Sequence, residues 1–501
     1  MTQPQADIVV IGSGFGGSVA ANRLVLAGKR VQLLERGPWR DSLPVRSMGI
    51  ERRSPFPLGG KAFTHFFHSL HRGRLSVRLR KTGMYELVSF PGLYALAASA
   101  VGGGSTAYGG LLVPPLDKAL WLDRHPQLDP ANIERYYDKV IDDMGGVRVS
   151  REQPLPMSIW DHFPESAGRR CRPAEEQPHV GFLIPPTAVQ AGQTTMLGSA
   201  GVQRQYSSFD GGAFLGSPSG AKASVDFVYL APVLDRGLTV RDLCEVTGIQ
   251  RARPADGGGY FVKFRDLANG TDDQVHAKQV VLAAGNLNTL RLLFAGSRQP
   301  ETLAPMPALG RSFYANGDLL AAWVRPDTSV SGFKCATTHG EFTVDGYESL
   351  HFGVGGFSGF DTWPLPAFVK RMLAKVFFMY GMGSDSGNAS VTFAKGRLDT
   401  DYDYRKEPVY EALRAAYRVV ASETGHRVIP MRKPLTPHMT GGARLGANAD
   451  VGVVDHRGEV YGNPGLYVAD AAALPAAPGG PPSVAIAAWA HHVADGIALR
   501  S

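Results

Sequence analysis

Cysteine is scarce in this sequence: Cys171, Cys244 and Cys335 are the only three among 501 residues. They are odd in number and far apart, which argues against a disulfide framework and against a zinc cluster. We therefore expect no metal site and a reducing compartment. Long hydrophobic runs are also missing, because no apolar stretch reaches the roughly 18–20 residues that a membrane span needs.

The start of the chain lacks the pattern of a secretion signal. A short polar lead is followed directly by "DIVVIGSGFGG", without the basic region, apolar region and cleavage site of a signal peptide. Because this segment already has the pattern of a core strand, we expect a cytoplasmic protein.

A strong excess of charge of one sign is absent as well. The 52 basic and 45 acidic residues leave a net charge of +7. This balance tolerates an anionic cofactor or an acidic lipid surface and does not require nucleic acid, so no nucleic-acid partner is expected. A hydrophobic fraction of 44% and a length of 501 residues are typical of a globular protein with two domains.

Glycine, in contrast, is abundant, with 60 residues. The first cluster follows a β-branched run that predicts a buried strand over 8–11, and it precedes a predicted helix. Gly12 allows a tight turn, Gly14 lets a pyrophosphate approach the backbone, and Gly17 lets the helix pack closely on the strand. The N-terminus of that helix offers N–H groups to the phosphates. This G-x-G-x-x-G pattern predicts a dinucleotide site.

A second predicted strand, over 31–34, ends at Glu35. A carboxylate at this distance from the glycines accepts the ribose hydroxyls of a dinucleotide. The sequence "ERG" at 35–37 favours FAD over NAD, because the chain turns away directly after the ribose ligand.

The second glycine cluster is "SAVGGGSTAYGGLLVPP", residues 99–115. Such a loop has few side chains to keep a flat ligand away, and its N–H groups can line a ring or a phosphate. The alternative is a loop tip that is simply flexible. The apolar flanks, Val101 and 111–113, are expected to be buried and favour the ligand-binding interpretation.

The later segments predict two kinds of structure. Residues 222–249 predict a helix, a turn at Gly237 and a strand, and "VVLAAG" predicts a buried strand over 280–282 with a small-residue turn into a helix. With Glu245–Val246 near the adenine, this part returns to the dinucleotide domain. From about 310 to 437, alternating aromatic segments predict an antiparallel sheet, and "LPAFVKRMLAKVFFMYG" (365–381) predicts a basic amphipathic helix.

Five motifs occur in a fixed order: the first glycine cluster with "ERG", "VGGGSTAYGG", "VVLAAGNLNTLRLL", "HMTGGARLG" and "NPGLYVADAAALPAAPGGPPSVAIAAWAHHVADGI". Together they span nearly the whole chain, which thereby resembles the glucose–methanol–choline (GMC) oxidoreductases, in particular their sterol-oxidase-like bacterial branch. The resemblance implies an α/β flavoprotein with a Rossmann-like FAD-binding domain and a substrate domain of antiparallel sheet covered by helices. It assigns 1–43, 99–120, 221–312 and 439–501 to the first domain, and 44–98, 121–220 and 313–438 to the second.

The resemblance also implies the site residues. His438 matches the active-site histidine of the family, and a histidine can accept the hydroxyl proton of an alcohol near neutral pH. The residues expected to bind FAD are Gly12, Gly14, Phe15, Gly16, Gly17, Glu35, Arg36, Gly103, Gly104, Ser105, Tyr108, Gly109, Val246, Ala284, Gly285, Asp470, Ala471, Pro482 and Ser483. The helix expected from Ser483 would point its positive end at the flavin ring. "GGGSTAYGG" has no histidine for covalent attachment, so noncovalent FAD is expected.

The sequence departs from the family pattern at three further candidates for the active site. Pro481 stands where most members carry an asparagine or histidine. Tyr108 stands where sterol oxidases carry an asparagine; it either stacks on or hydrogen-bonds near the ring, acts as a weak acid, or only fills space. For a glutamate of the sterol oxidases, Glu348 and His351 are the nearest candidates.

The expected activity is oxidation of the CH–OH group of a bulky lipophilic alcohol, sterol- or terpenoid-like, with His438 as the base and oxygen or an unknown acceptor. The alternative keeps the flavin for another lipid reaction, such as double-bond, isomerase, lyase or light-driven chemistry, and Pro481 favours it. A third hypothesis is a flavin-binding sensor without catalysis. The presence of His438 argues against this hypothesis. Two basic, aromatic stretches, 61–81 and 363–381, line an apolar pocket, rest on a lipid surface as a peripheral membrane contact, or form an ordinary basic surface over a core helix.

Overall fold

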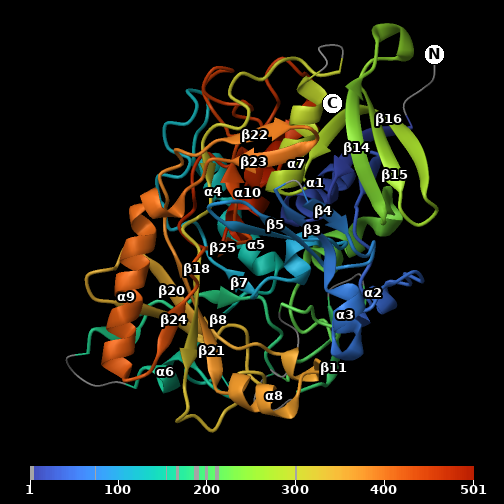
Figure 1. Ribbon diagram of the computed structural model, residues 1–501. Coiled ribbons are helices and arrows are strands. Elements are labelled where there is room, and N and C mark those ends of the chain that lie inside the picture. The colour runs from blue at the N-terminus through green and yellow to red at the C-terminus, as the bar shows by residue number, and fades with distance from the viewer. Residues whose placement is uncertain are drawn as a thin grey trace.

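A computed structural model describes residues 5–73, 75–153, 155–164, 169–185, 191–197, 201–208, 214–298 and 302–500. Two large sheets organise the chain, one next to the N-terminus and one at the opposite end of the molecule (Figure 1). No helix in these ranges is both long and apolar enough to cross a lipid bilayer.

The first sheet has a parallel core in which the neighbouring strands are β13, β2, β1, β16 and β27. Their bounds are Leu238–Arg241, Val31–Leu34, Ala6–Ile11, Thr271–Leu282 and Leu466–Val468. The β-branched runs of β1 and the end of β16 are buried, as expected of a sheet covered on both faces. The strands that the sequence predicts over 8–11, 31–34 and 280–282 are thus present.

An antiparallel extension leaves this sheet through β16. It consists of β14 (Cys244–Arg251) and β15 (Tyr260–Asp266), which pair in the order β16–β15–β14 and project from the upper right of Figure 1. The register between β14 and β15 shifts between Val246 and Gly248, as at a β-bulge.

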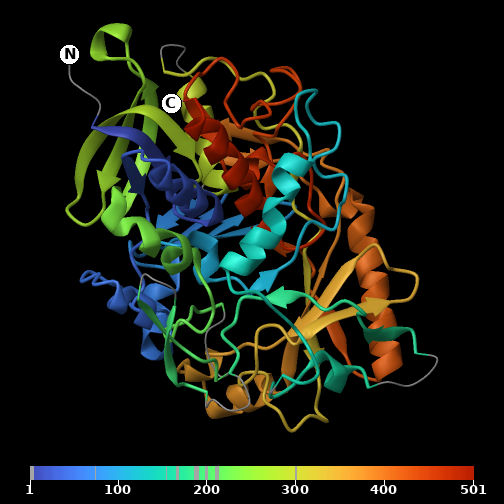
Figure 2. The same ribbon diagram turned by 180° about the vertical axis from the view of Figure 1, so that it is seen from behind.

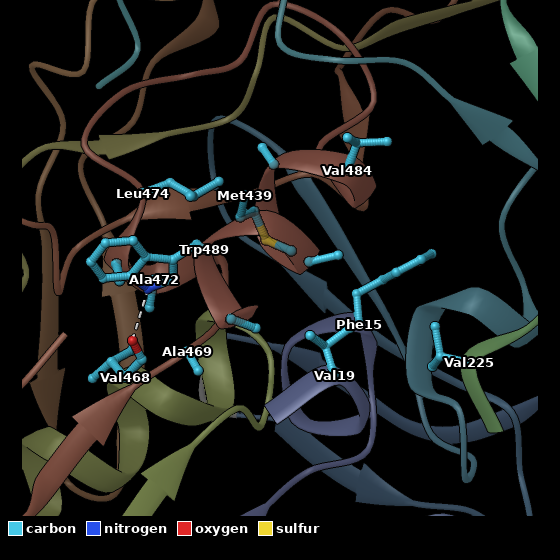
Figure 3. Packing of buried hydrophobic residues seen from close by; sticks show 14 of the residues in the cluster. Phe15, Val19, Val225, Met439, Val468, Ala469, Ala472, Leu474, Val484 and Trp489 are labelled. Atoms are coloured by element: carbon cyan, nitrogen blue, oxygen red, sulfur yellow. Dashed lines mark hydrogen bonds between the residues drawn. The ribbon is translucent and has the colours of Figure 1, made fainter. Parts of the chain in front are cut away.

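Helices α1 (Phe15–Leu26) and α10 (Ser483–Ala498) pack on each other beside the parallel sheet. Figure 3 shows this packing, in which Trp489 of α10 donates a hydrogen bond to the Val468 carbonyl at 2.9 Å. Met439 also lies in this cluster, next to α10. The segment that carries His438 is therefore anchored in the core. On the other side of α10 lies α5 (Tyr136–Asp143), as Figure 2 shows.

The second sheet is antiparallel, with the strand order β24, β18, β21, β20, β19, β9. The bounds are Val428–Pro430, Leu319–Val324, Val376–Met382, His351–Gly355, Gly340–Val344 and Cys171–Pro173. Helix α9 (Pro408–Thr424) covers its outer face (Figure 1). This arrangement confirms the mixed α/β fold with a helix-covered antiparallel sheet.

A third sheet joins the two parts in the order β25, β6, β5, β3, β4. Its strands are Leu435–Thr436, Tyr94–Ala98, Tyr85–Ser89, Phe67–Arg72 and Leu75–Arg78. Because β25 ends at Thr436, this sheet sets the position of His438 two residues later.

The remaining helices are α2 (Leu43–Ser47), α3 (Ala62–His65), α4 (Ala131–Glu134), α6 (Ile159–His162), α7 (Asn286–Ser297) and α8 (Ala367–Leu373). The remaining strands are β7 (Leu111–Leu112), β8 (Val147–Arg148), β10 (His179–Val180), β11 (Thr194–Leu197), β12 (Val202–Gln205), β17 (Phe313–Tyr314), β22 (Val391–Ala394), β23 (Arg397–Thr400) and β26 (Thr440–Gly441).

Two predictions of helix are wrong in part. The helix expected over 365–381 ends at Leu373, and β21 begins at Val376. A central strand between β18 and β20 satisfies the backbone of this β-branched and aromatic stretch, which overrides its amphipathic pattern. The helix expected after Lys222 is a π-helical turn (Asp226–Leu230) and a 3-10 segment (Ala231–Arg236), because Pro232 cannot donate the hydrogen bond of a regular helix.

Candidate active site

A cavity of about 860 Å³ lies between the first and second sheets. This is near the upper end of the roughly 300–1,000 Å³ of small-molecule sites. One end is lined by the two glycine loops and the ends of β2 and β14. The other end is lined by β18, β21 and the segment around His438.

The first glycine turn has three glycines with different surroundings. Gly12 has φ +94°, and a Cβ there would lie 2.3 Å from the Ala283 carbonyl oxygen. A Cβ at Gly17 would lie 1.9 Å from the Gly12 carbonyl oxygen. Gly14 lines the cavity, and a Cβ there would meet no protein atom within 4 Å. Gly12 and Gly17 thus serve the packing of strand and helix, whereas Gly14 faces space for a ligand.

The second glycine loop contacts the first. A Cβ on Gly103, which has φ +50°, would lie 2.6 Å from the Gly14 Cα, and the Gly102 N–H donates to Ser13 Oγ at 3.1 Å. Gly104 lines the cavity with nothing within 4 Å of its Cβ position. The two loops therefore form one continuous backbone surface along the cavity.

Ser105, one of the expected cofactor contacts, does not line the cavity. Its buried hydroxyl donates to the Gly102 carbonyl at 2.7 Å and accepts the Val225 N–H at 3.0 Å. It thus closes the turn of the glycine loop from behind.

Glu35 lines the cavity at the end of β2, as the sequence predicts. Its carboxylate accepts the Ser13 N–H at 3.0 Å, the Ser13 hydroxyl at 2.7 Å and the Gly37 N–H at 2.7 Å. Burial raises the pKa of Glu35, against these hydrogen bonds. The carboxylate is fixed by backbone and hydroxyl donors, and Oε1, which accepts only the Gly37 N–H, keeps acceptor capacity for a ligand hydroxyl.

Arginine side chains give this end of the cavity a positive character. Arg36 and Arg291 line it and pair with the buried Glu86, at 2.8 and 3.5 Å. Burial alone would raise the pKa of Glu86, but Arg36, His71 and Arg291 hold it well below its usual range. The sequence patterns gave no signal for Glu86, which sits on β5, far from the glycine motifs.

Asp470 lines the cavity beyond β27 and holds the turn after β16. Its carboxylate accepts the Gly285 N–H at 2.9 Å, the Thr289 hydroxyl at 2.5 Å and the Ala472 N–H at 2.9 Å. Burial raises the pKa of Asp470 to about 6. Other predicted contacts that line the cavity are Phe15, Gly16, Gly109, Val246, Ala284, Gly285 and Ala471.

The N-terminus of α10 opens into the cavity. Pro481, Pro482 and Ser483 line it, and the Ser483 hydroxyl donates to the Leu111 carbonyl at 3.2 Å. The first N–H groups of this sixteen-residue helix have no partner within the helix and leave its positive end toward the cavity.

Tyr108 lines the cavity with its ring, but its hydroxyl is occupied. It donates to the Ala223 carbonyl at 3.0 Å, and the ring meets Phe15 edge to face at 5.5 Å. Burial raises the pKa of the phenol. The buried Lys222 ammonium donates to the carbonyls of Thr106 and Tyr108, at 3.1 and 2.8 Å. The sequence gave no reason to select this lysine.

His438 lines the other end of the cavity, and its Nδ1 lies 2.9 Å from Oδ2 of Asp318. This is the distance of an ion pair, although the ring N–H is not aligned for a hydrogen bond. The Asp318 carboxylate also accepts the Thr436 hydroxyl at 2.6 Å, and Thr436 Oγ1 accepts the His438 N–H at 2.8 Å. Asp318 therefore contacts the histidine ring and the residue that holds its backbone. The sequence-based candidates did not include Asp318.

Asn316 links this pair to the loop before α10. It is buried in the left-handed conformation, with φ +58°. Its Nδ2 donates to Asp318 Oδ1 at 3.3 Å and to the Gly480 carbonyl at 3.0 Å, and its Oδ1 accepts the Gly479 N–H at 3.0 Å. Pro481 directly follows Gly480, so the hydrogen bonds of Asn316 to the backbone of Gly479 and Gly480 fix its position.

Glu348 is not part of the site. It lies in an exposed turn after β19, where its carboxylate accepts the Gly346 N–H at 2.8 Å. His351 is buried at the start of β20, and its Nε2 lies 3.2 Å from a different carboxylate, Glu341 of β19. Spacing along the sequence favoured Glu348, but the alternation of strand β19 points Glu341 inward.

Comparisons with known proteins agree with this geometry. Family models described as GMC oxidoreductase match residues 79–311 and 394–490. The chain belongs to the GMC oxidoreductase family. It is 26% identical to a cholesterol oxidase of Mycobacterium tuberculosis, over 98% of this chain and 91% of that protein. It is 22% identical to a long-chain-alcohol oxidase of Arabidopsis thaliana, over 99% of this chain and 67% of that one.

Among solved structures, the fold is similar to that of a pyridoxine 4-oxidase from Mesorbium loti, with a TM-score of 0.60 and 16% identity over 99% of this chain and 100% of that one. This GMC protein is an FAD-dependent oxidoreductase that acts on alcohols. Its cavity fits the cofactor, because Gly14 and Gly104 leave open space along the backbone next to the N-terminus of α1.

Proposed function

We propose that this enzyme oxidises the CH–OH group of a bulky lipophilic alcohol, sterol- or terpenoid-like, with His438 as the base. The pair of His438 and Asp318 at one end of a cavity whose other end fits FAD carries this proposal. The names of the cholesterol and long-chain-alcohol oxidases support it, and they favour the sterol-oxidase-like branch of the family.

His438 has the geometry of a proton acceptor. The Asp318 carboxylate favours the neutral tautomer that carries its proton on Nδ1, which leaves Nε2 to accept the proton of a substrate hydroxyl. The same carboxylate stabilises the imidazolium that this transfer produces. When bound, FAD supplies the acceptor for the hydride of the carbinol carbon.

The wall beyond His438 is apolar and suits a bulky substrate. Aromatic rings line it from several segments, namely Phe66, Phe214, Phe357, Phe360 and Phe378. These rings exclude water from the reacting carbon. They bind the hydrocarbon part of a substrate because binding removes apolar surface from water.

The test is anaerobic. The purified yellow protein is mixed with a panel of sterols, terpenols and long-chain alcohols, and the absorption band of the oxidised flavin is followed. Bleaching by one class is expected, and return of the colour on admitting oxygen identifies oxygen as the acceptor. A flavin that dithionite reduces but no alcohol bleaches would instead support other flavin-dependent lipid chemistry.

We further propose that the FAD is noncovalent. The loop 103–109 contains no histidine to which FAD could be attached. The phenol of Tyr108 in this loop already donates a hydrogen bond to the Ala223 carbonyl. Acid precipitation should therefore leave the yellow colour in the supernatant. A coloured pellet would contradict this.

We also propose a cytoplasmic protein that touches an acidic membrane surface. The three cysteines are buried and unpaired, which suits a reducing compartment. Phe63 of α3 is 80% exposed, and Phe368 and Met372 of α8 are 65% and 63% exposed, with Lys370 and Arg371 on the same short helix. Co-sedimentation with phosphatidylglycerol vesicles, lost in a Phe63→Ser/Phe368→Ser variant, is the expected result; no binding would refute the contact.

A further inference from the structure

On the neighbouring strands β19, β20 and β21 of the second sheet, three polar side-chain atoms are buried without a hydrogen-bond partner in the described parts of the chain. They are Oη of Tyr380, Nε2 of His351 and Oε1 of Glu341. The last two atoms lie 3.2 Å apart but are not aligned for a hydrogen bond. The His351 and Tyr380 side chains are more than nine-tenths buried.

The strand register places these side chains on one face of the sheet. Gly353 of β20 pairs with Glu341 of β19 on one side and with Tyr380 of β21 on the other, and His351 pairs with Met382. Directly paired residues of antiparallel strands point to the same face. Tyr380 and Met382 line the cavity. Glu341 and His351 lie on the same face of the sheet, next to Tyr380, but do not line the cavity themselves.

Gly353 makes room for this cluster. A Cβ there would lie 2.1 Å from Oη of Tyr380, so the tyrosine lies across β20 toward Glu341 only because this position has no side chain. The cluster therefore depends on Gly353, which lies between Glu341 and Tyr380 across the three strands.

The cluster is uncharged near neutral pH. Burial raises the pKa of Glu341 to about 8. Burial, with a smaller contribution from His438, lowers the pKa of His351 to about 4. Burial also raises the pKa of the Tyr380 phenol. A neutral carboxylic acid and a phenol are both O–H donors, so the surface suits an acceptor oxygen.

An unpaired buried polar group destabilises the folded protein, and a hydrogen bond to a ligand oxygen or to a water molecule removes that penalty. In the proposed reaction, His438 binds the hydroxyl that is oxidised. His438 follows β25 of the third sheet and is not part of the second sheet. The cluster on β19, β20 and β21 is therefore free to recognise a second polar group.

We propose that Tyr380, with Glu341 and His351 beside it on the same face of the sheet, forms a second polar subsite, which binds a hydroxyl or carbonyl oxygen that the substrate carries in addition to its reacting hydroxyl. This inference rests on the proposed alcohol oxidation and narrows its substrate class. The substrates are lipophilic diols or hydroxyketones rather than plain alcohols.

The test compares α,ω-alkanediols of six to twelve carbons with alkan-1-ols of the same length. The concentration for half-maximal anaerobic flavin bleaching is measured for each. At one length the diol should need roughly tenfold less than the alkanol, equivalent to about 1.4 kcal/mol. Bleaching without a diol preference at any length would overturn the subsite and leave the proposed function intact.

Variants separate the hydroxyl of Tyr380 from its ring. Tyr380→Phe should abolish the diol preference, measured as the ratio of the two half-maximal concentrations. Tyr417→Phe is the matched control, because its buried hydroxyl donates to the Leu319 carbonyl at 2.6 Å under α9, and it should keep the preference. Glu341→Gln retains a neutral donor and should keep most of the preference, whereas Glu341→Leu should lose it.

A measurement without turnover covers the case in which no alcohol bleaches the flavin. Long-chain monoketones and matched diketones are titrated into the oxidised holoenzyme, and binding is read from the shift of the flavin absorption. Tighter diketone binding that Tyr380→Phe removes supports the subsite even if the proposed function fails. Equal binding of both ketones would overturn it.

Discussion

The Asp318 carboxylate lies 2.9 Å from Nδ1 of His438, although Asp318 directly precedes β18 of the second sheet and His438 follows β25 of the third sheet. In the proposed mechanism this pairing leaves Nε2 as the nitrogen that faces the substrate. The proposal gives the two side chains different roles, because the histidine would accept the proton while the carboxylate would orient the ring and stabilise its charge.

His438→Asn should slow anaerobic flavin bleaching by about 10³-fold, within the range for loss of a general base. Asp318→Asn should slow it by about 10²-fold, because the base remains but its tautomer is no longer enforced. FAD content should be unchanged in both. Asp345→Asn, at an exposed ion pair with Arg172, is the control. An Asp318→Asn enzyme of full activity would contradict the assignment.

Gly14 and Gly17 differ in what a methyl group would meet, and this difference locates the cofactor. Gly14→Ala should leave the melting temperature of the apoprotein within a few degrees and weaken FAD binding at least tenfold, because its Cβ meets no protein atom but enters the cavity. Gly17→Ala should lower apoprotein stability, because its Cβ would lie 1.9 Å from the Gly12 carbonyl. Unchanged FAD affinity in Gly14→Ala would place the cofactor elsewhere.

Local rules predicted the first half of the site well. A strand, three spaced glycines, a helix and Glu35 follow each other without interruption, so their geometry depends on neighbours in the sequence. His438 was found through its motif. The buried strands β1 and β2 and the end of β16 follow from their β-branched runs.

The rest depends on contacts between distant segments. Asp318 reaches the cavity, and Asn316 and Glu341 come to lie near it, only when strands β18 and β19 take their places in the second sheet, and no local pattern fixes that register. The stretch after Leu373 was assigned to a helix because alternation over seven residues is a weak signal beside an amphipathic pattern. Glu348 was selected by spacing, which does not tell an exposed turn from the inward face of a strand.

Lys222 holds the second glycine loop from behind, and its removal should affect FAD binding without touching the cavity wall. Lys222→Met leaves the Thr106 and Tyr108 carbonyls without this donor, at a cost of roughly 1–3 kcal/mol for each. The apoprotein should melt several degrees lower, and FAD should bind at least tenfold more weakly. Lys118→Met, on an exposed lysine, is the control and should change neither property.

His491 should make the protein sensitive to acid. It is 1% exposed on α10, stacks on Tyr136 with ring centroids 4.7 Å apart, and neither ring nitrogen has a hydrogen-bond partner among the described residues. Burial lowers the pKa of His491 to about 4, from an ordinary value of 6.5. Between these two values the unfolded chain binds more protons than the folded one, so stability falls as pH drops from 6.5 to 4, by roughly 3 kcal/mol at most from this group.

His491→Phe keeps a ring to stack on Tyr136 and removes the titrating group. The free energy of unfolding, measured with denaturant on the apoprotein, should therefore differ little from wild type at pH 8 and exceed it by about 1–2 kcal/mol at pH 5. Because His68 and His339 also have lowered pKa values, of about 3 and about 4, the variant should keep part of the acid slope. Parallel stability curves for the two proteins between pH 8 and pH 5 would show that His491 is already charged, or already solvated, in the folded state.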